Sequence, residues 1–184
     1  MDITDLKKGS IIQVNGTPHR VVKYDHSSQA RGSAVVRTKL RDMRNGSMLD
    51  KTFRKGDKIE SADIDPVEAQ FLYSDGEQAY FMRLDTYDQL GIARAVLGEQ
   101  IGFLKEGMEI KVLLHQGKPL NVELPTKIEL EVISADPGVK GNSATNVTKQ
   151  CRVETGMEVS VPMFIESGDR IKVDTRSNEY VERA

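Results

Sequence analysis

A short polar segment with one arginine near its centre is the part of the sequence that could do chemistry. Residues 26–33 read His-Ser-Ser-Gln-Ala-Arg-Gly-Ser, so small or polar residues surround Arg31 on both sides. A guanidinium at the end of a turn between two strands offers a planar fork of donors that suits phosphates and base edges. The alternative is that Arg31, like most loop arginines, is only solvated.

Basic residues continue beyond Arg31. Arg37, Lys39 and Arg41 alternate along 34–41, which places them on one face of an extended strand, and Lys51 and Arg54 follow on the expected return strand. A row of cations at this spacing is typical of a surface that follows a nucleic-acid backbone. A solvated basic face without a partner is the alternative.

The elements that must position these residues are short strands. Asn15-Gly16 is the preferred dipeptide of a two-residue hairpin, and only 87–97 could form a short helix. Strands that alternate with turns in this way predict an all-β fold of small barrels or sandwiches. Four more turns are expected to join pairs of strands: Asn45-Gly46, Asp75-Gly76, Gln116-Gly117 and Ser167-Gly168.

A weak internal repeat divides the chain into three parts. The pattern Gly-x-x-[Ile/Val]-x-Val begins at Gly9, Gly107 and Gly156. Its glycine frees a turn, and its two branched residues face inward at a period of two. We therefore expect three consecutive small barrels, at 1–64, 65–127 and 128–184. Barrels of about 60 residues bury little core, so they should lean on one another.

The net charge conceals an asymmetry between these parts. The whole chain carries 26 Lys and Arg against 28 Asp and Glu, for a net of −2. Residues 1–64 hold 13 basic and 8 acidic residues, a net of +5, whereas 65–127 and 128–184 carry −4 and −3. A basic N-terminal part suggests that this end faces phosphates.

Several classes of protein are excluded by what the sequence lacks. It has no apolar run of membrane-spanning length and no secretory signal at its start, and its one cysteine, Cys151, cannot form an internal disulfide. Nucleophile, phosphate-loop and dinucleotide motifs are missing, and His19, His26 and His115 are too scattered for a metal site. We expect a cytoplasmic protein without cofactor, metal or enzymatic activity.

Longer motifs then identify a family. Residues 5–9 with Asn15-Gly16 look like an opening hairpin, and 31–34 followed by 39–41 look like a functional loop. The most specific stretch runs from Lys149 through Gly156, Val161-Pro162 and Ile165 to Gly168, and the ending 171–181 follows it. In these motifs the chain resembles bacterial elongation factor P along essentially its whole length. Cys151 departs from the signature, where alanine is usual.

The resemblance implies a KOW-type, SH3-like barrel followed by two OB-type barrels, in an L-shaped outline like that of a tRNA. Such factors bind the ribosome between the peptidyl and exit tRNA sites, contact rRNA of both subunits, and relieve stalling at consecutive prolines without being enzymes. Arg31 would reach the CCA end of the peptidyl-tRNA, either bare or altered by an arginine-modifying enzyme, for example by rhamnosylation. We expect a monomer whose loop flanks are Ser28, Gln29, Ala30, Gly32 and Ser33, and whose contacts to the acceptor arm or rRNA are Arg37, Lys39, Arg41, Lys51 and Arg54.

The resemblance also implies a ribosome-facing tip on the third barrel. Its expected residues are Lys140, Gly141, Asn142, Arg176 and Tyr180, although Asn142 and 145–148 depart from the family pattern and put the codon contact in question. Tyr180 could instead pack across its own strand. Two alternatives to the main function stay open: an elongation factor P-like paralog, which 27–32 resembles, and a general OB/KOW RNA-binding module without polyproline activity.

Overall fold

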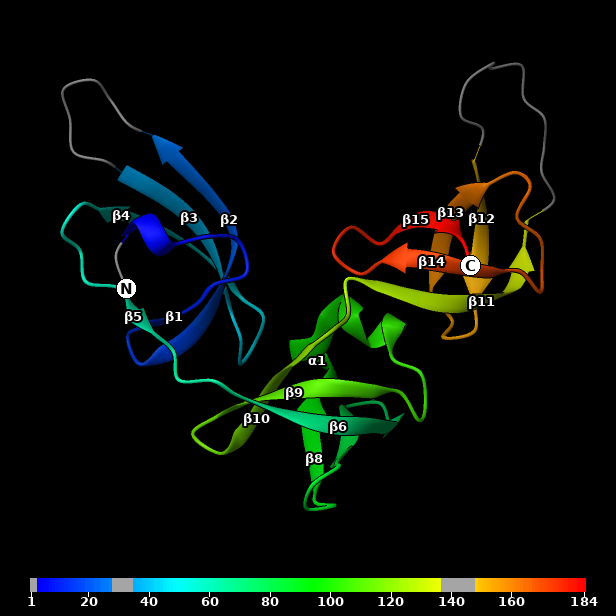
Figure 1. The fold of residues 1–184 in the computed structure, drawn as a ribbon, viewed down its shortest axis with the longest axis horizontal. Helices are drawn as coiled ribbons and strands as arrows, with labels where there is room; N and C mark the ends of the chain where they lie inside the picture. Colours follow the sequence, from blue (N-terminus) through cyan, green and yellow to red (C-terminus); the bar gives the residue numbers. More distant parts are fainter. Residues whose placement is uncertain (1–2, 28–34, 137–147) are drawn as a thin grey trace.

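The computed structural model describes residues 3–27, 35–136 and 148–184 and contains three five-stranded antiparallel sheets, one after another along the chain (Figure 1). Domain I pairs β4 (Met48–Arg54), β3 (Val35–Asp42), β2 (Thr17–Ser27), β1 (Ile11–Val14) and β5 (Glu60–Ser61) in that order. Domain II pairs β10 (Lys118–Glu123), β9 (Glu109–His115), β6 (Asp65–Ser74), β7 (Gln78–Arg83) and β8 (Gln89–Ala93). Domain III pairs β13 (Glu158–Pro162), β12 (Thr148–Val153), β11 (Lys127–Ala135), β14 (Arg170–Asp174) and β15 (Glu179–Arg183).

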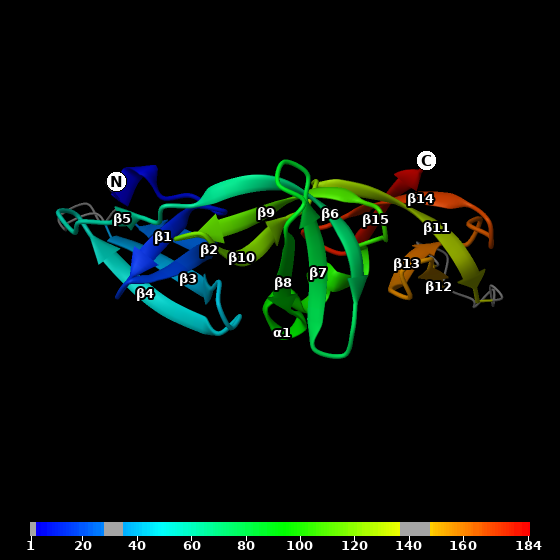
Figure 2. The same cartoon turned by 90° about the horizontal axis from the view of Figure 1, so that it is seen from below.

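The prediction of three consecutive barrels in an all-β chain is confirmed. Figure 1 shows domain II at the apex of a V, with domains I and III as its arms, and Figure 2 shows the three lobes in a row. The helical segments are short: η1 (Ile3–Asp5), α1 (Arg94–Leu97) and η2 (Gly98–Phe103).

The internal repeat marks the start of three core strands. Gly9, Gly107 and Gly156 have φ values of 94°, 82° and 86°, a left-handed conformation that favours glycine. The two branched residues after each glycine are buried in β1, β9 and β13, with exposed fractions of 5% or less. In each domain, the repeat therefore corresponds to a turn at glycine followed by a strand whose branched residues pack in the barrel core.

Two of the predicted hairpins have the expected turn. Asn15 and Gly16 both have positive φ, and so do Gln116 and Gly117, which is the geometry of a two-residue type I′ turn. The pairing expected around Ser167-Gly168 is wrong. β13 pairs with β12 while β14 pairs with β11, so this turn carries the chain across the barrel instead of closing a hairpin.

The short helix expected at 87–97 is mostly strand. β8 takes Gln89–Ala93, and α1 is only the four residues Arg94–Leu97. Gly91 pairs with Tyr80 of β7, and a Cβ there would lie 2.4 Å from the Gln78 side-chain oxygen. Pairing of β8 with β7 at Gly91 therefore outweighs the local preference for helix.

The domains pack against one another, as the small size of each core predicts. Between domains II and III, Phe103 of η2 is 1% exposed inside the apolar cluster of domain III. Two polar contacts accompany it: Lys105 Nζ lies 2.6 Å from Glu154 Oε2, and Asn178 Nδ2 donates to Glu99 Oε2 at 2.9 Å. Domains I and II share a smaller cluster, in which Met43 is buried against Leu113 and Leu120.

Candidate nucleic-acid interface

The segment that carries Arg31 connects two long paired strands of domain I. β2 and β3 pair from His19↔Asp42 to Ser27↔Val35, so residues 28–34 join them beyond the last pair. Arg31 and its expected flanks, Ser28, Gln29, Ala30, Gly32 and Ser33, lie outside the described residues. The structure shows the two-stranded support that leads to this segment, at the opposite end of β3 from Asp42 and Met43, which lie beside domain II (Figure 1).

Alternation along β3 separates a core face from a basic face. Val36, Thr38 and Leu40 are buried, whereas Arg37 and Lys39 are exposed. Thr38 is satisfied inside the barrel because its hydroxyl donates to the Lys51 carbonyl at 2.8 Å. The prediction that Arg37, Lys39 and Arg41 share one face of the strand is confirmed.

Neighbouring strands add to this outer surface, which we call the basic face. Arg54 lies opposite Val35 on β4 and is exposed, so it joins Arg37 and Lys39. Asp50 lies opposite Lys39, and Asp25 lies opposite Arg37. The basic face consists of Arg20, Lys23, Arg37, Lys39, Arg41 and Arg54, with Asp25 and Asp50 as its acidic members, and thus carries a net positive charge.

Two cations of the basic face were missed from the sequence. Arg20 pairs with Arg41, and Lys23 pairs with Lys39, because a bulge at Val22 shifts the register between Val21 and Lys23. The Lys23 ammonium lies 3.8 Å from the Asp25 carboxylate, and both side chains are exposed, so this ion pair contributes little to stability. The adjacent apolar residues Val21-Val22, which break strict alternation, are the sequence signal of the bulge.

Lys51 does not lie on the basic face. It pairs with Thr38 and therefore projects to the inner side of the sheet, where its ammonium lies 5.4 Å from the centre of the Phe53 ring. This cation–π contact and partial burial hold Lys51 apart from Arg37 and Lys39. Its expected contact with RNA stays a prediction, with less support than that of the other cations.

Arg41 lies at the domain junction instead of beside the 28–34 segment. It is half-buried and lines a cleft of about 580 Å³ where the three domains meet. Its expected contact with tRNA or rRNA also stays a prediction. The structure gives it a second set of neighbours, in domain II, that the sequence did not indicate.

The residues expected at the tip of domain III do not all lie in one place. Lys140, Gly141 and Asn142 lie outside the described residues, between the end of β11 and the start of β12. Arg176 and Tyr180 lie at the other end of β11, because Asp174 pairs with Lys127 and Tyr180 pairs with Val173. Their grouping with 140–142 is therefore corrected: the β14–β15 turn points toward domain I in Figure 1.

Each of these two side chains has a local partner. The Arg176 guanidinium donates to both Asp174 oxygens at 3.0 and 2.5 Å, and these hydrogen bonds hold the pKa of the Asp174 carboxyl well below its usual range. Tyr180 is half-buried and packs against the domain III core, as its alternative interpretation expected. Their expected contacts with the ribosome stay predictions.

Among the described residues, no group of three or more His, Cys, Asp or Glu side chains could hold a metal ion. Cys151 is buried on β12, and burial raises the pKa of its thiol. No helix among the described residues is long and apolar enough to cross a membrane.

Comparisons with known proteins match this architecture part by part. Three family models cover the chain: the elongation factor P KOW-like domain at 2–59, the elongation factor P OB domain at 64–122, and the elongation factor P C-terminal domain at 128–183. The chain belongs to the elongation factor P family. It is therefore a translation elongation factor by family, with a KOW-like domain in front of its OB domains.

Two curated relatives match this chain over nearly their whole length. Elongation factor P of Nitratidesulfovibrio vulgaris (strain DP4) is 46% identical over 180 residues, which cover 98% of this chain and 97% of the relative. Elongation factor P of Synechococcus sp. (strain JA-2-3B'a(2-13)) is 43% identical, over 97% of each chain. Among solved structures, eukaryotic translation initiation factor 5A from Methanococcus jannaschii has a TM-score of 0.52 at 23% identity and covers 67% of this chain and 92% of its own, which is a likeness of fold.

Proposed function

We propose that this chain binds the ribosome beside the peptidyl-tRNA and stimulates peptide bond formation where consecutive prolines stall it. The observation that carries the proposal is the basic face on β2, β3 and β4, whose strands lead directly to the segment with Arg31. The cations of this face would hold the acceptor arm of the tRNA and nearby rRNA phosphates. Arg31 would then reach the CCA end.

The action at the CCA end is positional. Proline is a constrained nucleophile, so a misplaced donor end is costly, and holding that end in reacting geometry restores the rate without adding a reacting group. Recovering ~2.8 kcal/mol of misalignment corresponds to about a hundredfold in rate. The chain would act as an accessory to the ribosome's own catalysis, as a monomer, in the cytoplasm.

Charge separation supports this orientation on the ribosome. Domain I is basic, whereas 65–127 and 128–184 carry net charges of −4 and −3. A basic end directs the factor to phosphates, and the acidic remainder limits indiscriminate binding to RNA. A general OB/KOW module is the alternative, but the match of all three family models in order favours the elongation factor.

The basic face predicts a salt-dependent affinity that depends on particular lysines and arginines. Titrations of fluorescently labelled protein with ribosomes that carry peptidyl-tRNA, at increasing KCl, should give a logarithmic slope that grows with the number of phosphates contacted. Arg37→Gln and Lys39→Gln should each lower this slope by roughly 0.7 to 0.9.

Lys51→Gln is the matched control, since Lys51 lies on the inner side of the same sheet. It should change the slope less than Arg37→Gln or Lys39→Gln. A slope near zero for the unaltered protein, or equal losses for all three variants, would contradict the assignment of the basic face.

A further inference from the structure

Arg41 is enclosed by glycines of two different domains. The position of a Cβ on Gly98 of domain II lies 2.9 Å from the Arg41 Nη2 atom. The corresponding position on Gly46 of domain I lies 3.5 Å from the same atom and 3.5 Å from the Ala95 carbonyl oxygen. The β3–β4 turn of domain I thus packs on α1 of domain II, with the Arg41 guanidinium between them.

Both glycines are needed for this contact. Gly46 and Gly98 have φ values of 75° and 56°, which side chains adopt only under strain. Gly98 also ends α1, and its backbone N–H donates to the Arg94 carbonyl. A Cβ at 98 would lie 2.9 Å from the end of the Arg41 side chain, so the guanidinium would have to shift from its present place.

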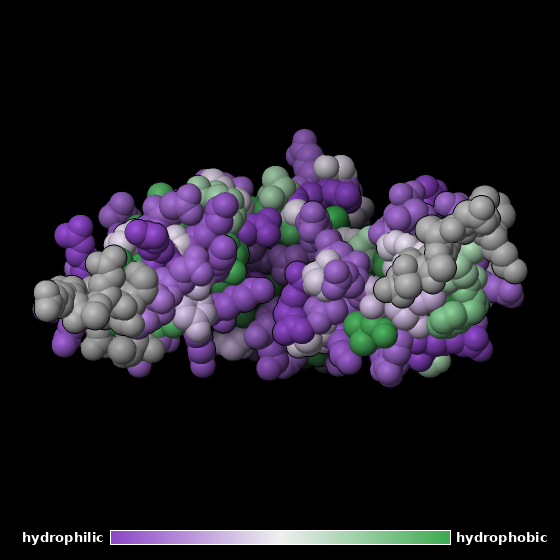
Figure 3. Space-filling model, turned by 90° about the horizontal axis from the view of Figure 1, so that it is seen from above, coloured by the Kyte–Doolittle hydropathy of each residue, from purple (hydrophilic) through white to green (hydrophobic). Residues whose placement is uncertain are grey.

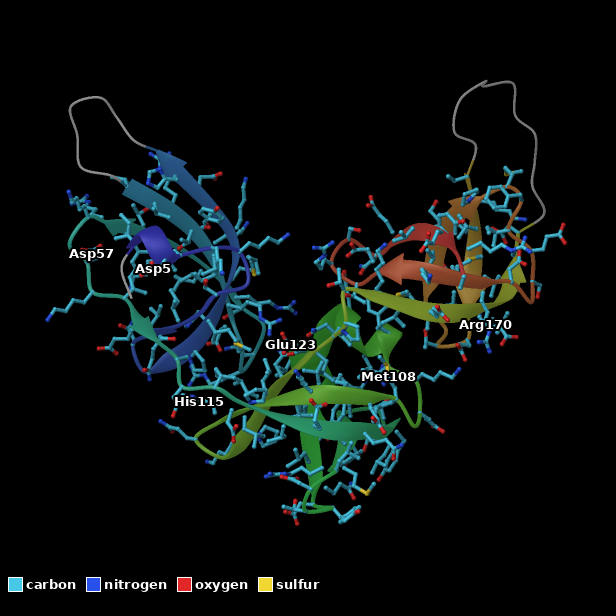
Figure 4. All side chains as sticks on the ribbon, in the orientation of Figure 1. Asp5, Asp57, Met108, His115, Glu123 and Arg170 are labelled. Carbon is cyan, nitrogen blue, oxygen red and sulfur yellow. The ribbon has the colours of Figure 1, made fainter. Side chains whose placement is uncertain are left out.

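A pair of opposite charges also faces across the same junction. Arg20, the partner of Arg41 on β2, faces Glu123 of domain II in the junction cleft. Burial and the neighbouring Arg41 lower the pKa of Arg20, and Glu123 opposes them. Figure 4 shows Glu123 where the lobes meet, and Figure 3 shows the hollow between the lobes seen from above.

The junction of domains I and II has a smaller apolar cluster than the junction of domains II and III. Its apolar cluster has Met43, Leu113 and Leu120 as its buried members, whereas Phe103 of domain II is buried in the larger apolar cluster of domain III. Domains joined by a small interface move relative to each other unless further contacts hold them. Besides this cluster, His115 Nδ1 of domain II lies 2.8 Å from the Asp63 carbonyl oxygen, and the side chains of Arg41 and Arg20 lie at the same junction.

We propose that Arg41 is a positioning residue, which fixes the angle between domains I and II through its packing between Gly46 and Gly98. This angle determines where the 28–34 segment stands relative to domain III. Its consequence for translation rests on the proposed function, because a factor that spans from the CCA end to the small subunit must hold these two ends at a fixed separation.

Pulsed electron–electron resonance on the free protein tests the angle without the ribosome. Spin labels are attached to Lys55→Cys, in the turn after β4 of domain I, and to Gln89→Cys on β8 of domain II, both exposed, in a Cys151→Ala background. Arg41→Met retains an unbranched apolar stem but removes the planar, multiply donating head. We expect it to broaden the distance distribution and shift its mean, while Arg37→Met, on the same strand face, leaves both unchanged.

Two further variants make the result decisive. Arg41→Lys keeps the charge but not the planar group, so it should broaden the distribution as well. Glu123→Gln alters the junction from domain II and should also broaden it, which keeps the test valid if Arg41→Met disturbs the folding of domain I. Distributions that match the unaltered protein for Arg41→Met, or for Arg41→Lys if Arg41→Met does not fold, would overturn the proposal. Because no ribosome is present, this outcome is separate from any failure of the proposed function.

Discussion

Replacement of Arg31 with alanine is expected to abolish the stimulation of proline–proline bond formation and leave the fold intact. The described core of domain I consists of residues outside the 28–34 segment, so we expect the fold to tolerate the change. If the guanidinium supplies ~2.8 kcal/mol of positioning, the stimulated rate should fall by about a hundredfold. Quench-flow measurement of proline–proline bond formation on purified ribosomes gives this rate directly.

The control for Arg31→Ala is Ser33→Ala, a substitution in the same segment that leaves the guanidinium in place. Circular dichroism should be unchanged for both variants. Equal stimulation by Arg31→Ala and the unaltered protein would remove Arg31 from its central role. Peptide mass spectrometry of the native protein shows in addition whether Arg31 is bare or carries an added group.

Phe103→Ala is expected to have the largest effect on stability. The ring belongs to η2 of domain II but is 1% exposed within the core of domain III, so its loss leaves a cavity between two domains. Truncation of a buried phenylalanine costs about 3–5 kcal/mol of unfolding free energy. Hydrogen exchange of the β11 and β12 amides should accelerate, and the urea midpoint of domain III should fall.

Phe164→Ala is the matched control for Phe103→Ala, since Phe164 is 63% exposed on domain III. Its unfolding free energy should change by no more than about 0.5 kcal/mol. Similar destabilisation by the two substitutions would show that Phe103 does not connect the domains.

Local patterns in the sequence predicted the barrels, since the turns and strands of a barrel depend on residues that are neighbours in the chain. The glycine repeat identified three core strands, and alternation placed Arg37 and Lys39 on an outer face. The Asn15-Gly16 turn has the backbone that its dipeptide prefers. These features follow from φ preference and a period of two, which are properties of a few adjacent residues.

The features that escaped the sequence depend on residues far apart in the chain. Arg41 meets Gly98, 57 positions later, and no local pattern indicates that contact. The bulge at Val22 moved Lys23 onto the basic face, and pairing of β14 with β11 separated Arg176 and Tyr180 from 140–142. Sheet order and register determine these placements, and they are fixed by tertiary packing.

The most direct test of the proposed function is the rate of peptide bond formation on ribosomes with and without this protein, for one template that encodes consecutive prolines and one that encodes none. We predict that the protein accelerates the proline template strongly and the other template little. Equal rates with and without the protein on the proline template would contradict the account.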